Sequence, residues 1–157
     1  MNTVLSYPDR GTGGDAHWRG NHSPRLSEDL FAWLKPARVF DPVCGSGTTG
    51  DVAKAMGISC WQGDLHSGFN ILRDEFPGLA DLVFFHDPYH DIIQYSGNVW
   101  GKQPHPDDLS RCPDYVTFIR KMDVAPLQRL PGSTPWRPSG DPGRGRKTQG
   151  CALSPAA

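Results

Sequence analysis

A glycine-rich turn between an apolar segment and a helix-forming segment constrains this chain more than any other feature. The stretch DPVCGSGTTG, residues 41–50, follows the apolar pair Val39 and Phe40 and leads into a segment typical of a helix. Short apolar segments recur at 58–61 and 82–85. This alternation of strand, turn, helix and strand is typical of a parallel sheet. The sequence therefore predicts an α/β fold, a Rossmann-like doubly wound parallel sheet, with its first strand in the centre.

Helix signals lie on both sides of this unit. Ser23 and Pro24 suit the cap and first position of a helix that continues to Pro36. The stretch FNILRDEF, 69–76, predicts one or two helical turns, and 115–122 predicts an amphipathic helix.

Composition divides the chain into three parts. The 157 residues include 18 Gly and 15 Pro, and only 37% are hydrophobic, but these residues are unevenly distributed. We expect an N-terminal arm over 1–22, one partial domain over 23–130, and a disordered or aberrant tail over 131–157, where aliphatic residues almost vanish.

Charge and cysteine content argue against several classes of protein. The net charge of -1 indicates no global basic field for nucleic acid, although a local basic groove would suffice. The four cysteines form no CxxC pair, so a zinc knuckle is disfavoured. Without an apolar signal segment or a spanning run of about 20 residues, we expect a cytoplasmic protein with no membrane contact.

The glycine turn indicates a ligand with a ribose. Gly45, Gly47 and Gly50 satisfy G-x-G-x-x-G, and Asp64 follows at the end of the next predicted strand, where a carboxylate can accept ribose hydroxyls. Asp41 at the mouth of the turn would repel a pyrophosphate and suits a cationic ligand such as S-adenosylmethionine. A tight turn without any ligand is the alternative.

Three segments resemble one family. FDPVCGSGTTG resembles the cofactor motif, and HDPYHDI the catalytic motif, of the S-adenosylmethionine-dependent amino-methyltransferases that modify exocyclic nitrogens of DNA bases. RGNHSPRLSEDLF resembles the segment that leads into the first helix of that family, and the similarity covers roughly residues 7–122. The resemblance implies methylation of adenine N6 or cytosine N4 in double-stranded DNA, with the target base flipped out.

The resemblance also implies roles for individual residues. Asp87 would accept hydrogen bonds from the target amino group, Pro88 would stiffen the loop, and Tyr89 would stack on the base. The expected residues of the cofactor site are Asn21, Ser23, Asp41, Pro42, Gly45, Ser46, Gly47, Thr48, Thr49 and Asp64. No metal is expected, because Pro88 interrupts any helical pairing of His86 with His90.

The catalytic stretch departs from the family pattern, which has two prolines. One alignment takes Asp87 as the acceptor and loses a proline, whereas the gapless alignment puts His86 in the acceptor's place. We favour Asp87, because a carboxylate orients an amine best. A neutral His86 would accept through a ring nitrogen.

The family's sheet has more strands than this sequence predicts. The sheet is expected to be incomplete on its C-terminal side, with 82–85 at an edge, unless a second chain completes it. Two alternatives to an active methyltransferase therefore stay open. One is a catalytically impaired cofactor-binding remnant, and the other is an NAD-binding oxidoreductase.

Overall fold

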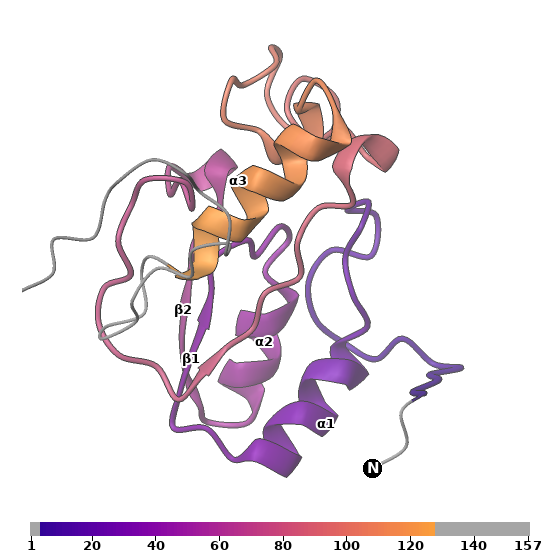
Figure 1. Cartoon of the computed structure of the whole chain (residues 1–157). Helices are drawn as coiled ribbons and strands as arrows, with labels where there is room; N and C mark the ends of the chain where they lie inside the picture. Colours follow the sequence, from indigo (N-terminus) through magenta and orange to yellow (C-terminus); the bar gives the residue numbers. More distant parts are fainter. Residues whose placement is uncertain (1–3, 128–157) are drawn as a thin grey trace, which may run out of the picture.

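The computed structural model describes residues 4–127, so the predicted tail over 131–157 lies outside the described residues. Its helices and strands are α1 (Pro24–Leu34), β1 (Arg38–Asp41), α2 (Thr48–Ala55), β2 (Ser59–Gln62), β3 (Leu82–Val83) and α3 (Tyr115–Leu127), shown in Figure 1. Short 3-10 turns lie at Leu65–Ser67, His90–Ile92 and Leu109–Arg111.

The three strands form one parallel sheet in the order β2-β1-β3. Val39 of β1 pairs with Cys60 on one side and with Leu82 on the other. The prediction that the first strand is central is confirmed, and β3 lies at an edge of the sheet that the described residues form. The chain is thus a mixed α/β protein, compatible with a fragment of a Rossmann-like sheet.

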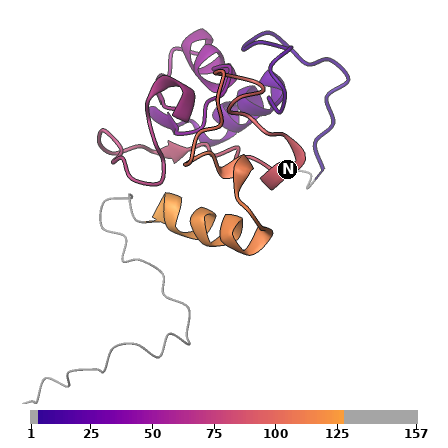
Figure 2. The same ribbon diagram turned by 90° about the horizontal axis from the view of Figure 1, so that it is seen from above.

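One face of the sheet is covered by α1 and α2. Phe31 of α1 and Val52 of α2 pack with Val39 and Phe84 in a buried apolar cluster. Figure 2 shows these two helices on one side of the strands and α3 on the other. The α1 helix begins as predicted, with the Ser23 hydroxyl accepting a hydrogen bond from the Arg25 N–H.

The opposite face is covered partly by aromatic side chains. Phe40 of β1 and Trp61 of β2 lie edge to face, with ring centroids 5.5 Å apart, and both contact Phe76. Phe69 stacks on Phe76. The Phe69 and Phe76 rings come from 69–76, so this segment covers part of the sheet without forming a helix.

The prediction of one or two helical turns over 69–76 holds only at its lower bound. Asn70 begins a single turn, because its carbonyl accepts a hydrogen bond from the Asp74 N–H at 2.8 Å and its side-chain oxygen accepts one from the Leu72 N–H. The Asn70 N–H donates to the Asp74 carboxylate, and the chain does not continue from this turn into a helix.

Other boundaries also differ from prediction. The second strand begins at Ser59 and not at residue 58, and β3 ends at Val83 and not at Phe85. The third helix continues past Met122 to Leu127, and its Phe118 packs with Leu109.

Candidate functional site

A cleft opens at the carboxyl ends of β1 and β2, where ligands bind in open α/β sheets. Its free volume of about 830 Å³ includes open solvent at its mouth. Four segments line it: the arm around 18–22, the glycine turn, the chain from 64 to 71, and the chain from 86 to 109.

The glycine turn shapes the floor of the cleft. Gly47 has φ 85° and precedes α2 as its N-cap, a conformation that a residue with a side chain rarely adopts. Gly45 has φ 50°, and a β-carbon there would lie 3.0 Å from Trp18 Nε1. The turn and the arm therefore approach each other closely at Gly45.

Asp41 is a buried carboxylate on this floor. Its exposed fraction is 2%, and burial raises its pKa to about 6. One of its oxygens accepts a hydrogen bond from the Val43 N–H at 3.3 Å. A carboxylate held in this environment gains from a ligand that brings positive charge.

Asp64 lies beside the turn and is engaged by the chain itself. Its Oδ2 accepts from the Gly45 N–H at 2.9 Å, and its Oδ1 lies 2.7 Å from His66 Nδ1. The hydrogen bond with Asp64 raises the pKa of His66. Asp64 therefore links the segment that follows β2 to the glycine turn by a hydrogen bond.

Aromatic rings border the mouth of the cleft. The Trp18 ring lies 5.2 Å from His66, and Trp100 lies 6.2 Å from His66 on a different segment. Trp18 and Trp100 both line the cleft, whereas Trp61 packs against the sheet. No periodic pattern in the sequence singled out these two tryptophans, because they lie on irregular segments.

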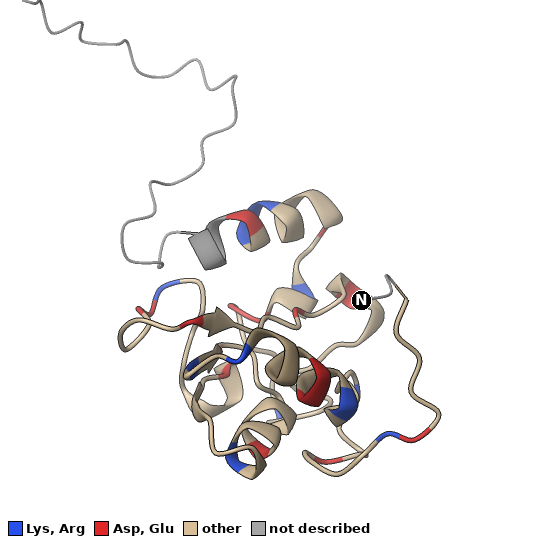
Figure 3. Ribbon diagram, turned by 90° about the horizontal axis from the view of Figure 1, so that it is seen from below, with Lys and Arg blue, Asp and Glu red and all other residues tan. Residues whose placement is uncertain are grey.

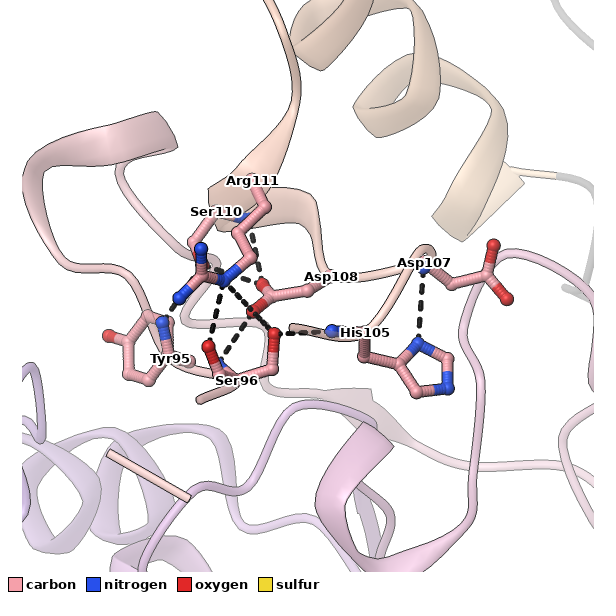
Figure 4. Close-up of polar contacts among 7 residues, drawn as sticks. All are labelled: Tyr95, Ser96, His105, Asp107, Asp108, Ser110 and Arg111. Atoms are coloured by element: carbon pink, nitrogen blue, oxygen red, sulfur yellow. Dashed lines mark hydrogen bonds and ion pairs between the residues drawn. The ribbon is translucent and has the colours of Figure 1, made fainter. Parts of the chain in front are cut away.

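The loop over 94–112 forms a wall of the cleft and is built around Asp108. Each carboxylate oxygen of Asp108 accepts two hydrogen bonds. Oδ2 accepts from the N–H and hydroxyl of Ser96 at 2.7 and 2.5 Å, and Oδ1 accepts from those of Ser110 at 2.9 and 2.6 Å. Arg111 Nε donates to the Ser96 carbonyl at 2.7 Å (Figure 4). Burial alone would raise the pKa of Asp108, but these bonds outweigh it and lower the pKa.

This network was missed at the level of sequence. Its only local signal is Asp108-Leu109-Ser110, a pattern that also caps an ordinary turn. The other partner, Ser96, is 12 residues away, so only the folded loop identifies it.

Two imidazole rings stand at the end of the cleft next to β3. His22 and His86 both line it and meet edge to face, 5.6 Å apart. His22 also contacts Phe84, and its Nε2 lies 2.7 Å from the Ser27 hydroxyl. Burial lowers the pKa of His22 to about 4 and also lowers that of His86, so both rings are neutral at pH 7.

The cleft brings together most of the predicted site residues. Those that line it are Asn21, Asp41, Pro42, Gly45, Ser46, Thr48, Asp64, His86 and Pro88. Those that do not are Ser23, Gly47, Thr49, Asp87 and Tyr89. Ser23 caps α1, and Thr49 is buried inside α2.

The lining carries carboxylates and no basic side chain other than histidine. Asp107 and Asp108 line it together with Asp41 and Asp64, and neither Lys nor Arg does. The Cys44 thiol also lines the cleft, but burial raises its pKa to about 12, so it is no thiolate nucleophile at neutral pH. In the part of the chain that the structure describes, no group of His, Cys, Asp and Glu is arranged to hold a metal ion.

No protein-family model, curated protein or solved structure matches the chain. Among residues 4–127, no helix is long and apolar enough to cross a membrane.

Proposed function

We propose that this chain binds S-adenosylmethionine and transfers its methyl group to an exocyclic amino group of a DNA base, adenine N6 or cytosine N4. The observation that carries the proposal is the lining of the cleft, which has four aspartates and no Lys or Arg. Asp107 and Asp108 have arginine partners outside the lining, Arg73 at 3.6 Å and Arg111 at 4.0 Å, so the argument rests on Asp41 and Asp64. A phosphate would meet like charge at these two carboxylates, whereas a ligand with an ammonium and a sulfonium would meet opposite charge.

The individual residues fit such a ligand. Asp41 would be stabilised most by a positively charged ligand, because burial disfavours its charged form. Oδ1 of Asp64 already contacts both the backbone N–H and the ring of His66, whereas Oδ2 accepts only from the Gly45 N–H and retains one lone pair for a ribose hydroxyl. Trp18 and Trp100 offer flat surfaces for a planar ring.

When bound, the cofactor would supply an activated methyl group, and this chain would hold the target amino group in position to receive it. His86 and Pro88 reach the cleft and would contact the amino group, while Tyr89, 49% exposed, would stack on the flipped base. The contact with DNA would have to be local. Figure 3 shows acidic and basic positions interspersed along the part of the chain that the structure describes.

A second candidate is a remnant that binds the cofactor without turnover. It is favoured by the position of Asp87, which does not line the cleft although it was the preferred acceptor. An NAD-binding oxidoreductase is disfavoured, because its pyrophosphate would face Asp41 and Asp64.

Calorimetry with S-adenosylmethionine and with NAD tests the proposed cofactor. Asp64→Ala should weaken S-adenosylmethionine binding by about 1–3 kcal/mol through lost charged hydrogen bonds. Asp123→Ala, at an exposed position on α3, is the matched control and should bind as the parent does. Tight NAD binding, or equal affinities in both variants, would contradict the proposal.

Methyl transfer itself is measured with double-stranded DNA and mass analysis of the product nucleosides. N6-methyladenine or N4-methylcytosine would support the enzyme. Cofactor binding without either product, in the full chain, would favour the remnant.

A further inference from the structure

A polar path leads from the cleft to solvent through His86. His86 lines the cleft, and its Nε2 lies 2.7 Å from the hydroxyl of Tyr89. The Tyr89 ring meets His86 edge to face at 5.6 Å and is half exposed to solvent. The other ring nitrogen, Nδ1, makes no hydrogen bond with the side chains and backbone described over 4–123.

The surroundings keep His86 ready to take up a proton. Burial lowers its pKa, and Asp87 partly opposes this by favouring the charged form. The facing ring of His22 is neutral at pH 7, so it adds no positive charge. The groups around His86 are thus His22, Asp87 and Tyr89, with Arg10 farther off, near His22.

We propose that His86 accepts the proton that leaves the methylated nitrogen, and that Tyr89 passes a proton on to solvent. This inference rests on the proposed function. As the new N–C bond forms, the C–S bond breaks with its electron pair on sulfur, and the nitrogen must lose one proton. Nδ1 of His86 takes that proton, Nε2 gives its own to the Tyr89 hydroxyl oxygen, and the Tyr89 hydroxyl proton goes to water.

The path assigns different roles to the two residues of the disputed alignment. His86 touches the cleft and would be the catalytic residue. Asp87 would be a positioning residue, because its charge favours the protonated form of His86. The Tyr89 hydroxyl becomes necessary, in addition to any stacking by its ring.

The first arm of the test is ¹⁵N NMR of the histidine side chains in the full chain without cofactor. In the parent, His86 should be the Nε2–H tautomer at pH 7 and should titrate below pH 6.5. Tyr89→Phe should shift its Nε2 resonance and its titration, whereas Tyr115→Phe, an exposed control on α3, should not. If Tyr89→Phe leaves the Nε2 resonance and the titration of His86 unchanged, the inference is overturned whether or not the chain is active.

The second arm is methyl transfer. Tyr89→Phe keeps the stacking ring, and His86→Gln keeps a polar side chain. Both should lower kcat roughly 100-fold, the usual scale of general acid–base catalysis, with S-adenosylmethionine affinity unchanged. In the parent, the rate should fall below the pKa of His86, and His86→Gln should lose that dependence.

The two proposals fail in distinguishable ways. An active chain in which Tyr89→Phe turns over like the parent overturns the proton path and leaves the methyltransferase proposal intact. A chain with the His86–Tyr89 bond in NMR that neither binds S-adenosylmethionine nor methylates DNA overturns the proposed function, and the proton path falls with it.

Discussion

The two halves of this molecule differ in how much of their structure depends on a buried polar network. Around β1, the helices α1 and α2 meet the sheet through apolar side chains such as Phe31, Val39 and Val52. The loop over 94–112 shares a smaller apolar cluster with α3 through Leu109 and Cys112, but its chain path is set by one buried carboxylate, Asp108, which receives four hydrogen bonds.

This difference separates scaffold from site. Apolar packing is non-directional and spread over many contacts, so the scaffold tolerates small changes. A buried polar network depends on every member, because an unpaired partner carries its full desolvation penalty. The cleft lies between the two halves and takes lining residues from both, so its shape depends on the more fragile half.

The largest expected effect comes from breaking the apolar half. Phe31 is 1% exposed, so Phe31→Ala should lower the free energy of unfolding by about 3–5 kcal/mol through lost packing and a residual cavity. Urea unfolding followed by circular dichroism measures it. Trp33→Ala, on the same helix but 63% exposed, is the control and should change stability by less than about 1 kcal/mol.

The second effect is an increase in stability. The Asp41 pKa rises from 3.8 to about 6 on folding, which corresponds to roughly 3 kcal/mol lost by the folded state at neutral pH. Because the folded chain binds the proton more tightly, stability falls as pH rises from about 3.8 to about 6 and is constant above that. Asp41→Asn should therefore stabilise the chain at pH 7 and flatten this slope.

Thermal unfolding of parent and Asp41→Asn at pH 4.5 and pH 7 separates the outcomes. A variant that is less stable than the parent at pH 7 would show that the charge is structurally required. The same variant should bind S-adenosylmethionine more weakly, so that stability and binding change in opposite directions.

The third prediction breaks the polar half. Asp108→Asn replaces one acceptor oxygen by an amide donor that faces the donors of Ser96 or Ser110, which should destabilise the loop by about 1–3 kcal/mol. Hydrogen exchange should become faster at the Ser96 and Ser110 amides and stay slow in β1. Asp123→Asn, at an exposed position, is the control. Uniformly faster exchange throughout the chain would contradict the separation into two halves.

The last prediction concerns His22, whose effect is absent at neutral pH and develops only in acid. Its pKa is depressed from 6.5 to about 4 in the folded chain, so the unfolded chain binds a proton first as pH falls. Stability should therefore be full above about pH 6.5 and decline toward pH 4, with the sign opposite to that of Asp41. His22→Gln should remove this decline. The test compares the pH dependence of the free energy of unfolding in Asp41→Asn alone with that in Asp41→Asn combined with His22→Gln. Identical pH profiles in the two chains would exclude His22 as the cause.

The scaffold could be predicted because its signals are local. The alternation of apolar segments with GSGTTG placed β1 and β2 within a residue or two and a helix directly after the glycine turn, and Ser23-Pro24 placed the start of α1. The segment 69–76 forms a single turn at Asn70 and no longer helix, and its Phe69 and Phe76 rings stack on each other beside the sheet. Helical periodicity alone does not predict how many turns form.

What the sequence determined by itself was the order of the elements and the carboxylates at the ends of β1 and β2, Asp41 and Asp64. Both follow from patterns within about 25 residues of chain. Only the tertiary structure decided that His22, Trp18 and Trp100 share a cleft with them. It also decided that His86 lines that cleft while Asp87 does not. The physical reason is that irregular segments have no period, so their side chains take their places from long-range contacts that form only when the chain folds.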